Sequence, residues 1–181
     1  MTDKPNDLLL LAGKALALIM QFFLALGAIA CVIALPLVIV FQGEINAQIL
    51  AEFGEDVGKL PLLAIIGLIG LIIALLGLAF VFFGKLRAII GTVGEGDPFA
   101  PINAVRLELM AWIMLACQVI ILPIGGLALF LAKWAEPMEN VEATIDVGIE
   151  LEGLLLVVIL FILARVFKHG AEMREDLEGT V

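Results

Sequence analysis

The chain has 181 residues, 63% of them hydrophobic and 16% charged, and a formal net charge of −9 at pH 7. Soluble domains contain roughly 45–50% apolar and about 25% charged residues, so this composition excludes an ordinary soluble domain and indicates an integral membrane protein. The chain has one histidine, and its two cysteines, Cys31 and Cys117, lie inside apolar runs. We therefore expect no metal site and no other cofactor.

The first apolar run predicts a membrane helix over about residues 15–41. Lys4 and Lys14 precede this run, and "AIAC" at 28–31 faintly resembles the cleavage box of a lipoprotein leader. A lipoprotein would become polar after the cysteine, whereas this chain continues with "VIALPLVIVF". We therefore expect a retained helix and no cleaved leader.

Two further uncharged runs predict membrane helices over about 61–84 and 107–132, since each exceeds the roughly 20 residues that cross a bilayer. The earlier one carries Gly70, Gly77 and Gly84 at every seventh position, with Ala74 between them. Such a stripe of small residues lets a neighbouring backbone approach closely, and whether that neighbour is the same chain or a second copy in a homo-oligomer stays open. In the later one, Gln118 is a candidate intramembrane polar contact, either with another helix or along a narrow pore, and we favour the contact with a helix.

Between these helices, residues 85–106 predict a tight cytoplasmic hairpin. The helical period continues past Lys85 as an amphipathic stem, and "GEGDP" at 94–98 then supplies two glycines and a turn. We expect Asn103 to be the N-cap of the next helix and Phe99 to pack back on the stem. A nucleotide-binding loop is not favoured, because neither the dinucleotide fingerprint nor the Lys-Ser or Lys-Thr of a P-loop is present.

The last apolar run, 153–164, is too short to span a bilayer alone, and extending it to about 149–167 predicts a fourth membrane helix. A cytoplasmic helix over 168–178 is expected to follow. An apolar stripe of Val166, Gly170, Met173 and Leu177 continues from the membrane helix along this segment. We expect ion pairs of Lys168 with Glu172 and of Arg174 with Glu178, and an end near Gly179.

The basic residues set the expected orientation. They concentrate before the first helix, in the middle loop and after the fourth helix, whereas the two other loops hold only Lys59 and Lys133. This distribution predicts an all-α, polytopic protein of four transmembrane helices in the cytoplasmic (inner) membrane, with both termini in the cytoplasm. No basic cluster exceeds this orientation signal, so we expect no direct binding of nucleic acid.

Two cytoplasmic segments, "GDPFAPINAVRL" at 96–107 and "VFKHGAEMREDLEGTV" at 166–181, resemble a bacterial membrane family of unknown function, the DUF numbered two-nine-seven-five. The matching positions in the loop are Gly96, Pro98, Phe99, Asn103, Arg106 and Leu107. Those in the tail are Val166, Phe167, Gly170, Met173, Arg174, Glu175, Asp176, Thr180 and Val181. Ile102, Leu177 and Gly179 depart from the family pattern. Members of the family are often encoded beside a small Xre/Cro-type helix-turn-helix regulator, so the resemblance implies a membrane component of a regulatory pair.

These observations favour a non-enzymatic membrane sensor or anchoring partner of a cytoplasmic helix-turn-helix transcriptional regulator, with the lipid bilayer as its other partner. The candidate contact residues are Phe99, Asn103, Arg106, Val166, Gly170, Met173, Arg174 and Leu177. The alternative is a small transporter or channel subunit in which Gln118 faces a conduit. An intramembrane enzyme is not favoured, because no catalytic constellation is patterned at membrane depth.

Overall fold

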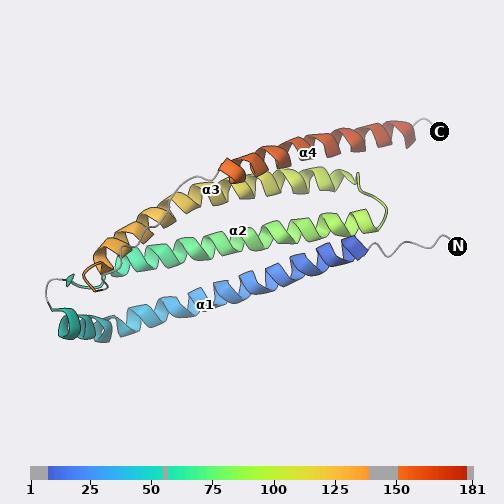
Figure 1. The fold of residues 1–181 in the computed structure, drawn as a ribbon. Helices are drawn as coiled ribbons and strands as arrows, with labels where there is room; N and C mark the ends of the chain where they lie inside the picture. The colour runs from blue at the N-terminus through green and yellow to red at the C-terminus, as the bar shows by residue number, and fades with distance from the viewer. Residues whose placement is uncertain (1–7, 55–56, 139–150, 179–181) are drawn as a thin grey trace.

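The computed structural model describes residues 8–54, 57–138 and 151–178, and this part of the chain is all-α (Figure 1). Its helices are α1 (Leu8–Phe53), α2 (Leu62–Gly94), α3 (Pro101–Ala135) and α4 (Leu151–Glu178). Within the described residues, three helices are long and apolar enough to cross a membrane: α1, α2 and α3. The three longest apolar runs were therefore assigned correctly from sequence.

The prediction of a fourth membrane-spanning helix over 149–167 is wrong. Residues 149 and 150 lie outside the described part of the chain, and α4 is one continuous helix that does not rank among the candidate spans. The uncharged stretch 153–164 covers about 18 Å at 1.5 Å per residue, against a hydrocarbon core of about 30 Å. Glu152 closes this stretch on one side and Arg165 on the other. The tail expected as a separate helix over 168–178 is the second half of α4.

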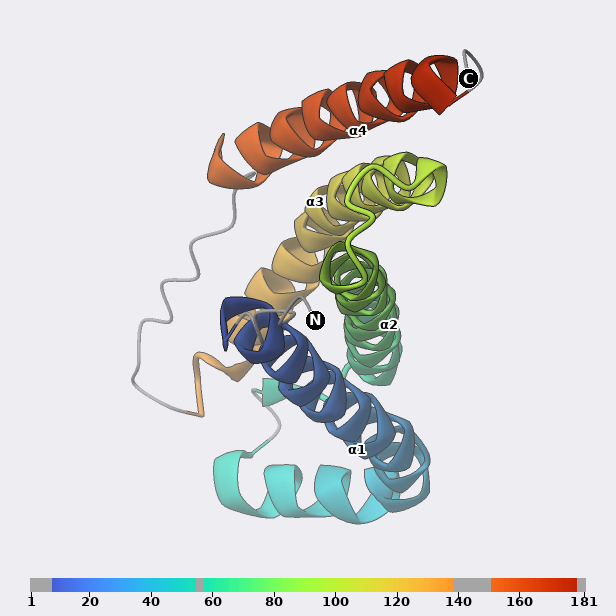
Figure 2. The ribbon, with the colours of Figure 1, turned by 90° about the vertical axis from the view of Figure 1, so that its right-hand side faces the viewer.

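The helices pack in chain order, α1 on α2, α2 on α3 and α3 on α4. Viewed along their length they form an open, curved row rather than a closed bundle (Figure 2). α4 runs along the first half of α3 and extends past the turn between α2 and α3 (Figure 1). We call the end of the molecule that holds this turn the hairpin end.

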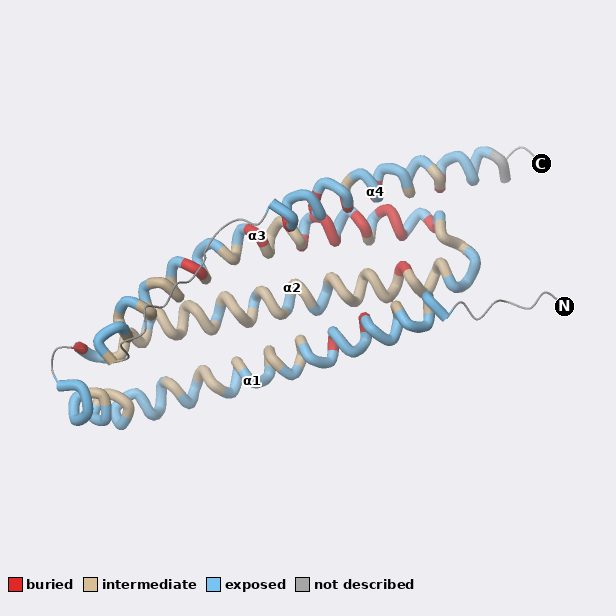
Figure 3. The backbone as a smooth tube through the Cα atoms, in the orientation of Figure 1, coloured by how far each residue is buried: buried red, intermediate tan, exposed pale blue. Residues whose placement is uncertain are grey.

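The buried side chains concentrate toward the hairpin end, where α2, α3 and α4 meet (Figure 3). The cluster there consists of Ile89, Leu107, Met110, Ala111, Leu160 and Ala164. Elsewhere many large apolar side chains are exposed, as expected for helices whose neighbours are lipid. The hairpin end is therefore the part of the molecule that packs like the interior of a soluble protein.

One polar contact joins α1 to α2 inside the apolar region. Gln21 is buried, and its Nε2 donates to the carbonyl oxygen of Phe80 at 3.2 Å. A Cβ placed on Gly84 would lie 3.1 Å from that same nitrogen, so the glycine makes room for the amide. The remaining members of the predicted small-residue stripe, Gly70, Ala74 and Gly77, are exposed on α2. The stripe is thus used for packing within the chain only at its Gly84 end.

All the basic side chains of the first three helices except Lys133, in the last turn of α3, lie toward the hairpin end. Gly13 of α1 lies against Ile90 of α2, and Arg106 of α3 bonds to the backbone of Ala88. These contacts bring Lys14, Lys85, Arg87 and Arg106 into one band across the molecule. Arg165 and Lys168 of α4 border a groove that is also lined by the first turns of α3.

Candidate functional site

The turn of the hairpin begins with a glycine-terminated end of α2. Gly96 has a φ of +86°, a conformation that glycine adopts without the Cβ clash of other residues. Its N–H donates to Val93 O at 3.1 Å, and the N–H of Asp97 donates to Thr92 O at 3.0 Å. These two bonds satisfy carbonyls that the end of a helix leaves open. Of the two glycines expected to adopt unusual conformations, Gly94 is instead in the last turn of α2.

Asn103 is the centre of the hairpin and is fully buried, with 0% of its surface exposed. Its Nδ2 donates to Thr92 Oγ1 at 2.8 Å and to Pro98 O at 3.0 Å, and its Oδ1 accepts from Arg106 Nη1 at 2.9 Å. The amide therefore joins α2, the turn and α3. We call Thr92, Asn103 and Arg106 the hairpin network.

The expectation that Asn103 caps α3 is wrong. The N-cap is Ala100, and Pro101 occupies the first turn, where a missing N–H costs no helical hydrogen bond. Asn103 lies inside the helix, and its side chain bonds across to α2 and back to the turn instead of to the first N–H groups of α3. In this conformation it positions the hairpin and presents nothing to solvent.

Arg106 completes the hairpin network. Besides its bond to Asn103, its Nη1 donates to the carbonyl oxygen of Ala88 at 3.1 Å. Thr92 donates its hydroxyl to Ile89 O at 2.8 Å, which leaves its oxygen to accept from Asn103. Each of these carbonyls lies in the last turns of α2, so the network fixes α3 at one position along α2.

Phe99 packs on α4, not on the α2 stem as expected from sequence. Its ring centroid lies 5.5 Å from that of Phe167, with the ring planes tilted by 47°. A Cβ on Gly170 would come within 2.6 Å of Phe99 Cδ1, so the ring occupies the space that the glycine leaves. One face of Phe99 is thus covered by α4, while 41% of the residue stays exposed.

An ion pair ties the end of α4 to the turn. Arg174 Nη1 bonds to Asp97 Oδ1, and both side chains are about half exposed. Glu172 pairs with His169 at 3.7 Å, where Lys168 had been expected as its partner. The side chains of Leu177 and Glu178 lie outside the described residues, so the predicted Arg174–Glu178 pair stays a prediction. The same holds for the expected end near Gly179, and for Thr180 and Val181.

The face that α4 turns to α3 differs from the predicted stripe. Its buried apolar side chains, at spacings of three, four and seven residues, are Val157, Leu160, Ala164 and Ala171. Gly170 borders this face, but Val166 and Met173 are more than half exposed. Two of the candidate contact residues therefore lie on the side of α4 that faces away from α3.

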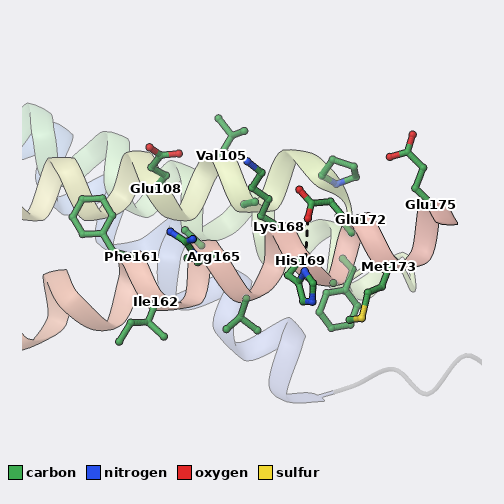
Figure 4. Close-up of a pocket in the computed structure, with 17 residues that line it drawn as sticks. Val105, Glu108, Phe161, Ile162, Arg165, Lys168, His169, Glu172, Met173 and Glu175 are labelled. Carbon is green, nitrogen blue, oxygen red and sulfur yellow. Dashed lines mark ion pairs between the residues drawn. The ribbon is translucent and has the colours of Figure 1, made fainter.

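An open groove of about 1290 Å³ runs between the first turns of α3 and the second half of α4 (Figure 4). Its apolar lining includes Phe99, Val105, Phe161, Val166 and Met173. Its charged lining is Glu108 on α3 and Arg165, Lys168, Glu172 and Glu175 on α4.

Deeper along the same interface, Gln118 is 5% exposed and lies against Gly153 of α4. A Cβ on that glycine would fall on the Gln118 amide. The intramembrane polar side chain singled out from sequence is therefore part of the α3–α4 contact. Sequence reasoning did not single out Thr92 or Gly153, and it gave Asp97 and Phe167 no partner, because these contacts form only when the helices pack.

The described part of the chain is therefore that of an all-α membrane protein, with three helices long and apolar enough to cross a membrane and a fourth helix that packs on the third beside the hairpin. The model of the family "protein of unknown function (DUF2975)" matches residues 47–181. The chain belongs to this family. No curated protein and no solved structure matches it.

Proposed function

We propose that this protein is a non-enzymatic membrane anchor or sensor that holds a cytoplasmic helix-turn-helix regulator at the hairpin end. The observation that carries the proposal is the docked second half of α4. Its outer side leaves Val166 and Met173 exposed beside Phe99, although these residues lie beyond the uncharged part of the helix. Exposed apolar side chains outside the bilayer are typical of a protein-binding surface.

Charge supports a cytoplasmic hairpin end. Lys14, Arg87 and Arg165 lie toward this end, whereas Lys59, just before α2, and Lys133, in the last turn of α3, lie toward the other. Basic residues are retained on the cytoplasmic side of membrane helices. α1 begins and α4 ends at the hairpin end (Figure 1), so on this orientation both termini lie on the cytoplasmic side of a bacterial inner membrane, and the exposed surface faces soluble partners.

The hairpin network supports a fixed rather than an adaptable surface. Asn103 and Arg106 hold the turn, and Phe99 and Asp97 in turn hold α4. A partner thereby meets side chains whose positions are set before binding, which lowers the entropic cost of association. Of the candidate contact residues, Asn103 acts through this positioning, whereas Val166 and Met173 touch the partner.

Crosslinking from native membranes tests the proposal, with membrane insertion of every variant measured separately. The intact chain should capture a cytoplasmic helix-turn-helix protein, and a chain truncated after Lys168 should not. The double variant Val166→Ser/Met173→Ser should lose most of the capture, whereas Phe53→Ser, an exposed apolar position at the opposite end, should keep it. Equal capture by the intact and truncated chains, or none by either, contradicts the proposal.

The alternative of a transporter or channel subunit rests on Gln118 facing a conduit. The buried position of Gln118 against Gly153 supports a packing role for this side chain. Flux through proteoliposomes that is lost in Gln118→Leu, with the variant folded, would favour the alternative.

A further inference from the structure

One face of α2 lies between its contacts with α1 and with α3. Gly84 and Ala88 are four residues apart, so they are neighbours on this face. From α1 the amide of Gln21 lies against Gly84, and from α3 the guanidinium of Arg106 donates to the carbonyl oxygen of Ala88. The two flanking helices therefore border the same face from opposite sides.

Glycines continue this face along α2 in both directions. Gly70, Gly77, Gly84 and Gly91 recur at every seventh residue, which keeps them on one side of the helix, and we call them the glycine face. A Cβ added to Gly70, Gly77 or Gly91 would meet nothing within 4 Å. Only Gly84 is closely approached, by Gln21, so the described side chains of α1 and α3 leave the rest of this face uncovered.

Three basic side chains gather at the hairpin end of the glycine face. Lys14 precedes Gln21 by two helical turns, which places it beside Gly91 in the antiparallel α1–α2 pair. Lys85 comes one turn before the residue whose carbonyl oxygen binds Arg106. All three lie next to the uncharged stretches of their helices, so in a bilayer they lie at the depth of the lipid headgroups.

The described acids do not neutralise these three side chains. Within the described residues, Lys14 and Lys85 take part in no ion pair or hydrogen bond. Arg106 makes both of its bonds through Nη1, which leaves Nε and Nη2 without a described partner. Glu108 lines the groove toward α4, and Glu95 lies at the end of α2, about 15 Å beyond Lys85.

We propose that this face binds an anionic phospholipid, with its phosphate between Lys14, Lys85 and Arg106 and an acyl chain along the glycine face. A phosphate accepts several charge-assisted hydrogen bonds, and an arginine can donate two at once through Nε and Nη2. Gly77 lies about 10 Å from Gly84 along the helix, within one leaflet of about 15 Å. This inference concerns a lipid ligand and does not rest on the proposed regulator.

The charges favour the lipid over a second copy of the chain. Two copies related by a twofold axis along the membrane normal would contact each other through the same face of α2. The three cations of one copy would then lie opposite those of the other, and like charges would meet. An anionic lipid instead neutralises the cations and covers the apolar surface below them. A free phosphate ion has no apolar part to cover that surface.

Native mass spectrometry of the detergent-solubilised full chain tests the proposal, with phosphatidylglycerol and phosphatidylcholine of identical acyl chains as probes. The intact chain should retain phosphatidylglycerol at least about fivefold more than phosphatidylcholine. Lys14→Gln/Lys85→Gln should remove most of this preference. The matched control is Lys59→Gln/Lys133→Gln, which loses the same charge at the opposite end and should keep the preference.

A second pair of variants tests the path of the acyl chain. Gly77→Leu fills the glycine face and should lower the retention of both lipids. Gly126→Leu is its control, because a Cβ on this glycine of α3 also meets nothing within 4 Å, and it should leave retention unchanged.

Four results overturn the proposal. They are equal retention of the two lipids by the intact chain, an equal loss of preference in the two lysine double variants, and unchanged retention in Gly77→Leu. The fourth is a dimer of the intact chain that Gly77→Leu dissociates, because it assigns the glycine face to a second copy.

Discussion

Replacing Asn103 by alanine should loosen the whole hairpin end. The substitution removes the two bonds that Nδ2 donates, to Thr92 Oγ1 and Pro98 O, and the bond that Oδ1 accepts from Arg106. Two neutral bonds contribute about 0.5–1.5 kcal/mol each and a bond to a charged group about 1.5–3 kcal/mol. Because the site is fully buried, water does not replace them readily. We expect a loss of about 3–5 kcal/mol in the free energy of unfolding.

Two measurements on the detergent-solubilised protein follow this change. Denaturant or steric-trap unfolding gives the loss in free energy, and hydrogen exchange gives its location. Exchange should accelerate at the amides of Gly96 and Asp97, whose bonds close the end of α2. Asn46→Ala is the control, because Asn46 Oδ1 accepts a single bond, from Leu60 N at 2.8 Å, at the far end of the molecule.

Asn46→Ala should lower the free energy of unfolding by about 1 kcal/mol and leave hydrogen exchange at the hairpin unchanged. If Asn103→Ala lies within about 0.5 kcal/mol of the wild type, the hairpin network does not stabilise this end. The same conclusion follows if Asn46→Ala and Asn103→Ala have equal effects. Either result would also remove the positioning role assigned to Asn103.

Three further changes probe the contact between α3 and α4. Gly170→Ala places a methyl group within 2.6 Å of the Phe99 ring. We expect the free energy of unfolding to fall by about 1–3 kcal/mol and hydrogen exchange in the last turns of α4 to become faster. Gly153→Ala displaces the Gln118 amide, and its destabilisation should shrink when combined with Gln118→Ala; purely additive unfolding energies would contradict this contact. Arg174→Gln should cost at most about 1 kcal/mol, and less at high salt, because both partners of its ion pair are about half exposed. A salt-independent loss of several kcal/mol would show that Arg174 does more than pair with the turn.

The spans follow from sequence, but the place of the last helix does not. An uninterrupted apolar run longer than a bilayer is thick leaves a chain few alternatives, so α1, α2 and α3 were expected. For 149–167 the prediction counted Glu152 and Arg165 as tolerable ends of a span. What composition does not reveal is that α4 lies along only half of α3, since this depends on which side chains meet across the interface.

At the hairpin, too, the sequence predicted some features and not others. The sequence singled out Asn103 and Arg106 as candidate contact residues, but a capping role was assigned to Asn103 because Asn before an apolar helix usually caps it. The role it has instead requires Thr92, which becomes its neighbour only when α2 and α3 pack. Phe99 was assigned to the nearer stem because nothing local indicates Phe167, which lies on a helix two elements later.

The α3–α4 interface is set at two points by glycine, and this fixes the surface that the chain presents. Gly153 accommodates Gln118 and Gly170 accommodates Phe99, roughly five helical turns apart. Sliding α4 by one turn would place side chains bearing a Cβ over both polar and aromatic neighbours at once. α4 is therefore held in one register on α3, and Val166 and Met173 point outward as a consequence of that register. A helix too short to be anchored by the bilayer alone is thus positioned by two close contacts with α3 and its preceding turn.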